Sequence, residues 1–520
     1  MGSGTIVTPA KGSRMPEVSR EQETQNLGIC EKCRSVVPAR HEDRDGSVYY
    51  IKQCPTCGPT EVLVSSNAAQ WRAKRTLCEY KGEARASCSL HCTECVHGKA
   101  PTLVFVDVTN RCNMNCPICL ANIPAMGFTF DPPMAYFDRM FKKLATFAPK
   151  PKIQLFGGEP TVRSDLIDII HLAKSYGLSA RVVTNGIRLA DEAYCRQLLA
   201  TGTQLMFAFD GRHPDIYRKL RRTPKALELK LKALDNVRKY HQSKVTIMCC
   251  AGLGVNDKYL KDTIDFCHER RDYIAALDLI PLVETWGPEA VEAGDTTIDD
   301  VERMLREALP GTEFVPSGVF YKFPTFREYF DLRVTFGGAH PNCESVTMLV
   351  SDGRCYHPVS KYLKKSLSDV AADAIALDRK MAETLNRSLL GKIFGRRGKQ
   401  LLLGWQVLGL ARRSINFSEV FGGHTSRSVI QILWGLLRGK KMKDLLRRHS
   451  RCHGILRVIV LPFEEPKNVE SARLVECPAQ FAYEHPVTRE IGFMPVCAWS
   501  VYKNDLLRET AKRYGVATSA

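Results

Sequence analysis

Short apolar runs alternate with amphipathic helical patterns through the middle of the chain. Between residues 101 and 335, six apolar stretches of strand length each run into a turn that is polar or rich in glycine. They occupy residues 103–108, 153–156, 180–183, 205–209, 245–249 and 276–280. This rhythm predicts a parallel sheet with right-handed helical crossovers. Six units are too few for an eight-unit barrel, so we expect an α/β fold with a partial (β/α)6 barrel, whose active site lies at the C-terminal strand ends.

The loop after the first stretch holds three cysteines, Cys112, Cys116 and Cys119, in C-x3-C-x2-C spacing. Four thiolates complete the ligation of a [4Fe-4S] cluster, so three thiolates leave one iron open to a small molecule. The amino and carboxylate groups of a cofactor can bind that open iron. We therefore predict that these three cysteines are the catalytic metal ligands.

The ends of the later stretches carry groups that suit such a cofactor. Gly157 and Gly158 allow a close backbone approach, and Glu159 can accept hydrogen bonds from an ammonium group. Thr184 and Asn185 offer a hydroxyl and an amide to a ribose or a carboxylate. The predicted cofactor-binding residues are Gly157, Gly158, Glu159, Thr184, Asn185, Asp210 and Asn256.

Two C-x2-C pairs near the start of the chain predict a separate metal site. The pairs are Cys30 with Cys33 and Cys54 with Cys57, and an alternating strand pattern lies between them. Four thiolates in this spacing form a tetrahedral site for zinc or mononuclear iron. The pattern leaves open whether this is a structural zinc ribbon or a rubredoxin-like redox centre.

Eight further cysteines are predicted to hold two auxiliary clusters. The first set has C-x3-C-x2-C spacing but no preceding strand, and a second zinc site is its alternative. The second set falls into two pairs that each bracket a predicted hairpin, with Cys452 as a competing ligand. The two sets are Cys78, Cys88, Cys92, Cys95 and Cys343, Cys355, Cys477, Cys497. The remaining cysteines, Cys195, Cys249, Cys250 and Cys267, fit buried small apolar positions.

Length and composition predict several domains. The chain has 520 residues, 44% of them apolar, which indicates two to four globular domains. Its twenty cysteines lie in a chain without an apolar leader, so we expect reduced thiols that bind metal rather than disulfides. The predicted parts are a disordered segment at 1–25, metal knuckles at 26–64, an auxiliary-cluster segment at 65–100, the barrel at 101–335 and a C-terminal auxiliary-cluster domain at 336–520.

The net charge of +18 is concentrated in an insert at residues 386–451, which holds fifteen Lys or Arg residues against two acids. Within it, apolar runs at 401–410 and 429–437 each contain a tryptophan and have basic flanks. Such runs suit helices that lie in an anionic membrane interface. Their alternative is ordinary core helices with solvated charges. Nothing resembles a nucleic-acid-binding module, and no apolar run is long enough to span a membrane.

The loop at 112–119, together with Gly157, Gly158 and Glu159, resembles the radical S-adenosylmethionine (SAM) superfamily. The resemblance implies reductive cleavage of SAM and a 5′-deoxyadenosyl radical that takes hydrogen from an unactivated carbon. The order of the metal-binding segments over residues 28–505 looks like the tetraether synthase branch, whose relatives include a radical SAM pterin methylase. That branch implies coupling of two lipid tails at terminal methyl carbons, three [4Fe-4S] clusters and one mononuclear iron. The basic insert departs from the pattern.

We therefore expect a radical SAM oxidoreductase that forms a carbon–carbon bond between lipid tails. Its expected partners are a lipid substrate or membrane surface, reached through the basic insert, and an electron donor such as ferredoxin or flavodoxin. The expected location is cytoplasmic, on the inner face of the membrane. One alternative is a radical SAM methylase or maturase acting on a soluble pterin or peptide. Another is an iron–sulfur electron-transfer or scaffold protein without catalysis.

Overall fold

A sheet of parallel strands forms the centre of the molecule. The computed structural model describes residues 26–80, 88–95, 97–282, 291, 295–330, 337–387, 389–423, 425–438, 442–463 and 466–515. The segment predicted to be disordered, 1–25, lies outside the described residues.

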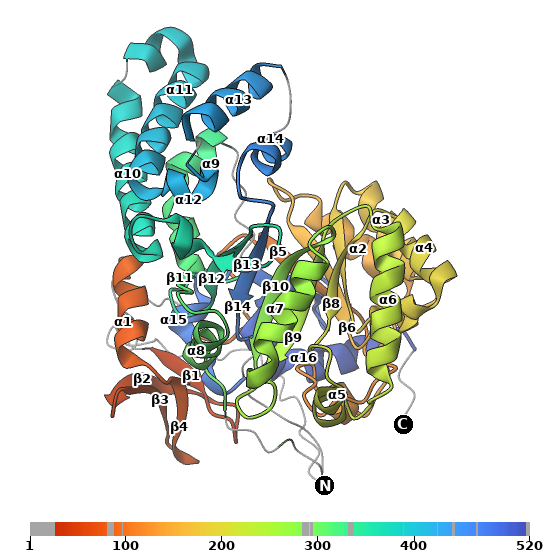
Figure 1. Ribbon diagram of the computed structural model, residues 1–520. Coiled ribbons are helices and arrows are strands. Elements are labelled where there is room, and N and C mark those ends of the chain that lie inside the picture. Colours follow the sequence, from red (N-terminus) through yellow and green to blue (C-terminus); the bar gives the residue numbers. More distant parts are fainter. Residues whose placement is uncertain are drawn as a thin grey trace.

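The six predicted barrel strands are confirmed, in the predicted order and all parallel (Figure 1). They are β5 (Leu103–Thr109), β6 (Lys152–Gly157), β7 (Ser179–Thr184), β8 (Gln204–Ala208), β9 (Val245–Ala251) and β10 (Ile274–Pro281). Every residue of β5 is buried, as expected for a strand covered on both faces. The neighbouring strands pair in parallel register from β5 to β10 and leave the barrel open.

Helices follow the strands and cover the outer face of the sheet (Figure 1). They are α2 (Met134–Leu144), α3 (Leu166–Ser175), α4 (Glu192–Ala200), α5 (Pro214–Arg221), α6 (Ala226–Tyr240) and α7 (Leu260–Glu269). In α2, the apolar residues recur at helical spacing, and Phe137, Met140, Phe141 and Leu144 are all buried against the sheet core. Each helix therefore returns the chain to the N-terminal edge of the sheet, and every parallel strand ends at the opposite edge.

C-terminal strands extend the same sheet at both edges. At one edge, β14 (Gly454–Val460) runs parallel to β10 and then pairs with β12 (Ser345–Ser351), which is antiparallel to it. At the other edge, β15 (Ala479–Glu484) runs parallel to β5 and leads through β16 (Ile491–Pro495) into α16 (Val496–Arg513). Short strands β11 (Val315–Pro316) and β13 (Tyr356–Pro358) flank β12, and α8 (Ile298–Ala308) and α9 (Pro324–Phe330) lie between β10 and β12 in the sequence.

A stack of aromatic rings attaches the C-terminal strands to the barrel. The rings of Phe105 and Phe481 stack with their centroids 5.1 Å apart, and Trp499 stacks on the other side of Phe481 at the same distance. The indole Nε1 of Trp499 donates a hydrogen bond of 2.9 Å to Asp107. Burial of three large rings and one satisfied polar pair makes this contact strongly stabilising.

The N-terminal unit is a four-stranded antiparallel sheet followed by α1 (Ala68–Leu77). Its strands are β1 (Leu27–Ile29), β2 (Val36–Arg44), β3 (Ser47–Cys54) and β4 (Gly58–Ser65). Buried polar contacts hold it on the C-terminal part: Asn26 donates to Glu470 over 2.8 Å, and His41 pairs with the same carboxylate over 3.3 Å.

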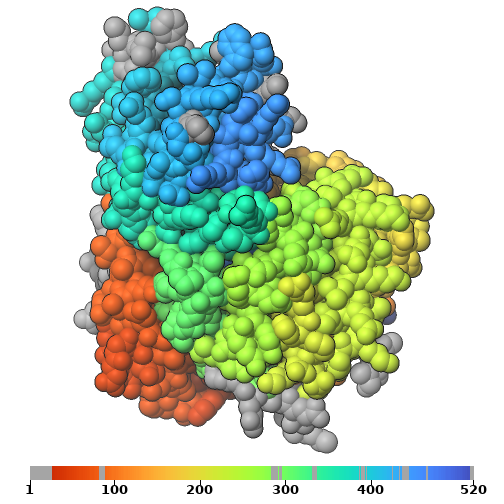
Figure 2. All heavy atoms as spheres, viewed as in Figure 1, coloured from red at the N-terminus to blue at the C-terminus, as the bar shows by residue number. Residues whose placement is uncertain are grey.

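The basic insert forms a helical bundle that projects from the rest of the molecule (Figure 2). The insert contains α11 (Leu389–Ser414), α12 (Phe417–Phe421), α13 (Thr425–Leu437) and α14 (Met442–His449), and α10 (Leu367–Arg387), which precedes it, packs against α11. Leu377, Met381, Leu385, Leu403 and Leu410 form a small core between α10 and α11. Within the described residues, no helix combines the length and apolar character that crossing a membrane requires.

Candidate functional site

The three predicted cluster cysteines lie together at the end of β5. Cys112, Cys116 and Cys119 all line one cavity of about 160 Å³ at the C-terminal edge of the parallel strands. The loop closes on itself, since the backbone N–H of Cys119 donates to the carbonyl of Cys116 over 3.2 Å. The sulfur of Cys112 accepts a hydrogen bond of 3.4 Å from the N–H of Met114. One short loop therefore presents three thiols to a common space.

Gly157 and Gly158 bring the end of β6 against the loop after β5. The N–H of Gly158 donates to the carbonyl of Thr109 over 2.7 Å, and the N–H of Glu159 donates to Arg111 over 2.8 Å. A Cβ added to Gly157 would lie 2.1 Å from the Thr109 oxygen, and one on Gly158 would lie 2.2 Å from the Arg111 oxygen. Only glycine permits this approach, and at Gly157 a φ of +128° requires it as well.

Glu159 is buried and ties two strand ends together. One oxygen accepts from the hydroxyls of Thr161 and Thr184, over 2.6 and 2.7 Å, and the other accepts from the N–H of Asn185 over 2.6 Å. The amide nitrogen of Asn185 lies 3.9 Å from the sulfur of Cys112. Glu159, Thr184 and Asn185 therefore form one hydrogen-bonded wall of the cavity.

Asp210 and Asn256, which we predicted to bind the cofactor, do not line this cavity in the described structure. Asp210 is fully buried and binds Arg221 through two hydrogen bonds of 2.8 and 2.9 Å. Asn256 donates to the carbonyl of Cys250 at the end of β9 and accepts from the N–H of Gly252. Both strand ends close into tight local hydrogen bonds, so these side chains act behind the wall rather than in it.

Two cations near this wall were missed by the sequence analysis. Arg221 lines the cavity, and buried Lys230 donates to the carbonyls of Asn185 and Ala208 over 2.6 Å each. Burial lowers the pKa of Lys230 to about 8. Arg221 lies in a run of basic residues at 218–225 that is indistinguishable from a solvated helix end in the sequence. Asp210 stands at the end of an apolar run in the sequence. An aspartate in that position indicates a cationic partner, because an isolated buried charge is costly.

Comparison with known proteins identifies the domain that contains this cavity. A model of the radical SAM superfamily matches residues 106–267. The chain contains a radical SAM domain. Residues 24–66 match a second model, the HMPTM N-terminal zinc ribbon domain.

Among relatives, the chain is 30% identical over 316 residues to a 7,8-dihydro-6-hydroxymethylpterin dimethyltransferase of Methanocaldococcus jannaschii, covering 58% of this chain and 62% of the relative. It is 28% identical over 224 residues to a GTP 3′,8-cyclase of Marinobacter nauticus, covering 42% of this chain and 66% of that one. The chain thus spans less than two thirds of either relative. A solved radical SAM methyltransferase from Sphaerobacter thermophilus is 16% identical, with a TM-score of 0.30, over 52% of this chain and 73% of that chain.

The domain implies SAM and a [4Fe-4S] cluster, and the residues present fit both. The three thiols of the loop after β5 match a cluster with one open iron, while Cys250, which also lines the cavity, comes from β9. Gly157 and Gly158 line the same cavity as the thiols, and their backbone packs directly on the loop that carries those thiols. Cys112, Cys116 and Cys119 would hold the cluster, while Gly157, Gly158 and the Glu159–Asn185 wall would border the cofactor.

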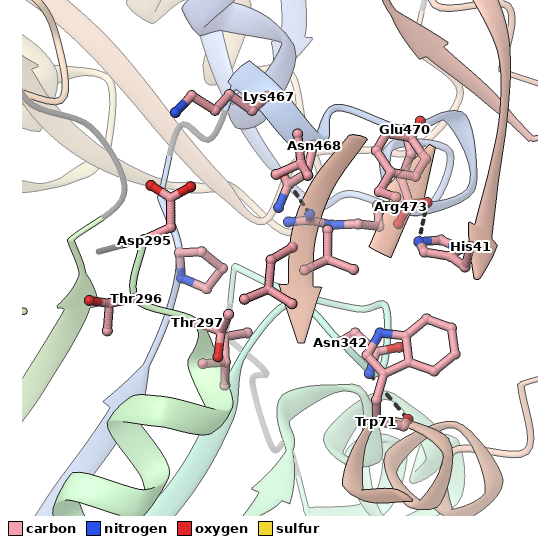
Figure 3. A pocket seen from close by; sticks show the side chains of 16 residues that line it. His41, Trp71, Asp295, Thr296, Thr297, Asn342, Lys467, Asn468, Glu470 and Arg473 are labelled. Carbon is pink, nitrogen blue, oxygen red and sulfur yellow. Dashed lines mark hydrogen bonds and ion pairs between the residues drawn. The ribbon is translucent and has the colours of Figure 1, made fainter. Parts of the chain in front are cut away.

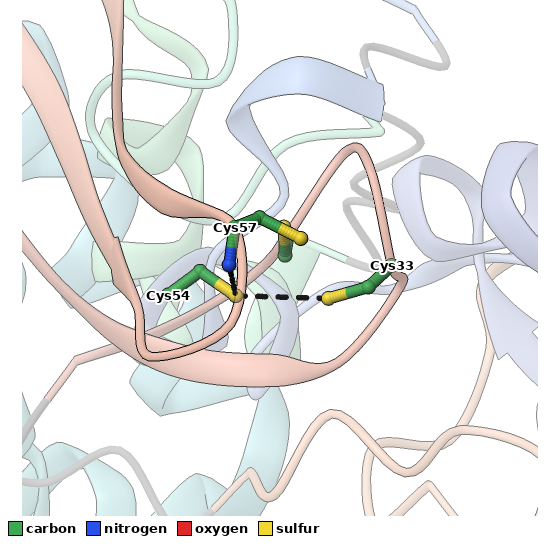
Figure 4. A group of neighbouring side chains, drawn as sticks. Cys33, Cys54 and Cys57 are labelled. Carbon is green, nitrogen blue, oxygen red and sulfur yellow. Dashed lines mark hydrogen bonds between the residues drawn. The ribbon is translucent and has the colours of Figure 1, made fainter.

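The N-terminal cysteines form the predicted four-sulfur site (Figure 4). The thiols of Cys30, Cys33, Cys54 and Cys57 all lie within 4.8 Å of one another, and those of Cys33 and Cys54 are 3.6 Å apart. Gly58 follows with a φ of +80°, which lets the backbone turn beneath the thiols. The matched family is a zinc ribbon, so zinc is the metal supported here.

A pocket lies at the boundary between this zinc ribbon and the sheet domain (Figure 3). His41 and Trp71 line it from the N-terminal unit, and Asn342, Glu470 and Arg473 line it from the C-terminal part. Asn342 donates to the carbonyl of Trp71 over 3.3 Å. The pocket walls are thus joined by direct polar contacts at the domain boundary.

The first predicted auxiliary set is only partly assembled. Cys88, Cys92 and Cys95 lie together, and burial and the two other thiols raise the pKa of Cys92. Cys78, the predicted fourth ligand, instead packs in a separate apolar cluster with Val315 and Val319. Burial raises its pKa to about 12. Cys78 is the C-cap residue of α1 and lies in a different apolar cluster from Cys92.

The second predicted auxiliary set needs a correction. Cys343, Cys477 and Cys497 line one cavity, but Cys355 is not among its lining residues. Cys343 and Cys355 bracket the single strand β12 rather than a hairpin. Its six residue steps separate the two ends by about 20 Å, so Cys355 cannot join the other three thiols. Cys452 is near Cys355, not near this group, because Gly454 pairs with Ser351.

The cavity lined by Cys343 adjoins the cavity lined by Cys112, Cys116 and Cys119, which is called the SAM cavity below. The two share Leu120, Phe156, Val183, Met248 and Ile280. Its volume is about 170 Å³, and most of its wall is apolar. The buried polar side chains of Gln154, Asp278 and Glu344 and the partly buried Arg181 also face it.

Asp278 makes stability depend on pH. Burial raises its pKa to about 6, although Arg457 and Arg181 oppose the shift. A raised folded pKa means that the folded state binds the proton more tightly, so the stabilisation is lost as pH rises through 6. We expect the free energy of unfolding to fall by about 1 kcal/mol between pH 5 and pH 7 from this group. Denaturant unfolding of Asp278→Asn should show a flatter pH profile than wild type, whereas equal slopes would contradict the assignment.

Proposed function

We propose that this protein uses SAM to take hydrogen atoms from the hydrocarbon tails of lipids and joins two tails by a carbon–carbon bond. The observation that carries the proposal is the apolar cavity that opens onto the SAM cavity. A hydrocarbon chain gains about 0.8 kcal/mol for each methylene transferred into such a space. The phenylalanines at 105, 156 and 463, with Met206 and Met248, supply the apolar wall.

The chain contributes position and exclusion of water. SAM bound to the cluster supplies the 5′-deoxyadenosyl radical. Phe156 and Met248 border both cavities, so a tail held by them would lie next to the cavity that would hold SAM. Cys343, Cys477 and Cys497 also line the apolar cavity, which suits an auxiliary cluster in contact with the substrate. A low-potential donor such as ferredoxin or flavodoxin would supply the electron.

The helical insert is the proposed contact with the membrane. On α11, Leu401, Trp405 and Leu408 follow helical spacing and are 74%, 73% and 60% exposed. On α13, Ile430 and Trp434 are 65% and 56% exposed. Exposed arginines surround both faces: Arg396, Arg397, Arg412, Arg413, Arg427 and Arg438. Exposed apolar rings among arginines fit an anionic phospholipid surface, most simply the inner face of the cell membrane.

Replacing Leu401 and Trp405 with serine should weaken binding to anionic vesicles by at least about tenfold, because both side chains lose apolar burial in the interface. Co-sedimentation with phosphatidylglycerol vesicles measures this binding. Val487→Ser is the matched control, since Val487 is 81% exposed on the distant β15–β16 turn. Equal binding by the double variant and wild type would exclude this face as the membrane contact.

The lipid reaction is tested with reduced, cluster-loaded protein, SAM, dithionite and phospholipid vesicles. The expected result is two deoxyadenosines and the loss of two hydrogen atoms from lipid for each new bond, both measured by mass spectrometry. Deoxyadenosine formation with unchanged lipid would overturn the lipid proposal, but it would still agree with a radical SAM domain that cleaves SAM.

A second candidate, methylation of a pterin, is favoured by a specific observation. Within the described residues, one oxygen each of Gln154, Asp278 and Glu344 is buried without a hydrogen-bond partner. A heterocycle rich in N–H donors would satisfy such acceptors. The M. jannaschii relative, named a pterin dimethyltransferase, points the same way. Turnover of dihydropterin that Asp278→Asn abolishes, with no change in lipid, would favour this function over the first.

A further inference from the structure

The turn between β12 and β13 brings together three potential metal ligands that neither cavity uses. Nε2 of His357 lies 2.9 Å from Oδ2 of Asp352 and 3.6 Å from the sulfur of Cys355. All three ligand atoms lie within 4.8 Å of one another. Each side chain is partly exposed, so an ion can reach them from solvent.

These separations agree with a tetrahedral zinc site. Zinc bonds of about 2.3 Å to sulfur and 2.05 Å to nitrogen, at a tetrahedral angle, place the two ligand atoms roughly 3.6 Å apart. The carboxylate lies slightly closer to the imidazole than it would around a metal, because the two are now hydrogen-bonded. Mixed thiolate, imidazole and carboxylate ligands suit zinc better than magnesium or calcium, which take oxygen ligands.

Cys452, which comes two residues before β14, lies near the same turn and is a candidate fourth ligand, although its sulfur is not within 4.8 Å of all three other ligand atoms. Gly454 pairs with Ser351, and the N–H of His453 donates to the Ser351 carbonyl over 2.8 Å. Continuing this antiparallel register places Cys452 opposite Gly353, in the middle of the turn.

We propose that Asp352, Cys355, His357 and Cys452 bind a zinc ion. The inference is independent of the proposed lipid function. The site lies at the N-terminal edge of the parallel strands, at the opposite end of β12 from Cys343. It therefore belongs neither to the SAM cavity nor to the zinc ribbon.

The ion would secure the helical insert to the sheet. Cys452 directly follows the insert, whose last residue, Arg451, donates its N–H to the carbonyl of Val420 over 2.8 Å. The N–H of Asn416 donates to the carbonyl of Tyr362, just after the hairpin, over 2.9 Å. A metal that joins Cys452 to the hairpin would link the end of the insert to the strand from which it departs, and so fix how the bundle stands on the barrel.

Zinc and iron content per chain tests the site. Protein expressed with zinc and then desalted should hold zinc at the ribbon and at this site, and Cys355→Ser or His357→Ala should lose about one zinc per chain. Asp352→Asn should keep the turn, because Oδ1 still accepts from the N–H groups of Arg354 and Cys355, and should bind zinc less tightly. Cys195→Ser, at a buried helical position of α4, is the control and should lose none. Unchanged zinc in all three ligand variants would overturn the proposal.

X-ray absorption at the zinc edge gives a second reading on the wild-type protein, even where a variant does not fold. The expected spectrum contains scattering from an imidazole and from oxygen in addition to sulfur. A spectrum of four sulfurs alone, as the ribbon would give, would also overturn the proposal.

Discussion

Replacing Cys116 with alanine should reduce deoxyadenosine formation from SAM by at least about 100-fold, because two thiolates cannot hold the three irons that leave the fourth open. Cys116 is the middle ligand of the loop and lines the cavity between Cys112 and Cys119. Liquid chromatography of anaerobic reactions with dithionite measures the product directly. Iron content should fall by one cluster while zinc at the ribbon is unchanged.

The control for this variant is Cys195→Ala. Cys195 is fully buried in α4, away from the cysteine loop, and we expect its loss to leave SAM cleavage within about twofold of wild type. Wild-type protein that forms no deoxyadenosine under any reducing condition would favour the electron-transfer or scaffold alternative. Undiminished cleavage by Cys116→Ala would remove this loop from the catalytic centre.

The parallel strands could be predicted because burial on both faces produces continuous apolar runs. The run at 103–108 became β5, and each later run became the expected strand within two residues. The glycine–glycine–glutamate edge was also predictable, since its backbone approach to Thr109 tolerates no side chain. Each of these features is encoded by a short segment of the sequence, either an apolar run or the glycine–glycine–glutamate motif.

Contacts between distant segments could not be predicted in the same way. The spacing of Cys343 and Cys355 does not reveal that the chain between them runs straight as β12. The pairing of β15 with β5 joins residues that lie more than 370 positions apart, and no local pattern encodes it. Arg221 could not be predicted, because the sequence alone does not show whether an arginine is buried or solvated. The ion pair with Asp210 shows that it is buried.

The Asp210–Arg221 pair is therefore the least predictable part of the cavity wall. Asp210 has no exposed side-chain area and Arg221 has 15%. Burial alone would lower the pKa of Arg221, but Asp210 and the nearby Cys116 thiol raise it well above its usual range. Asp210 also accepts from the N–H of Cys250 over 3.0 Å. Each charge is paired, so removing either one leaves the other buried without its ion-pair partner.

We expect Asp210→Asn and Arg221→Met each to lower the free energy of unfolding by about 3–5 kcal/mol, and the double variant to lose much less than the sum. The introduced asparagine would keep an acceptor for Cys250, and the introduced methionine would keep the apolar volume of the side chain. Urea unfolding of the four proteins measures the coupling, and additive losses would show that the pair is not a closed unit. In the double variant, the free energy of unfolding should recover, whereas SAM cleavage should not. Because the guanidinium that lines the cavity beside Cys116 is gone, SAM cleavage should stay low even where stability returns.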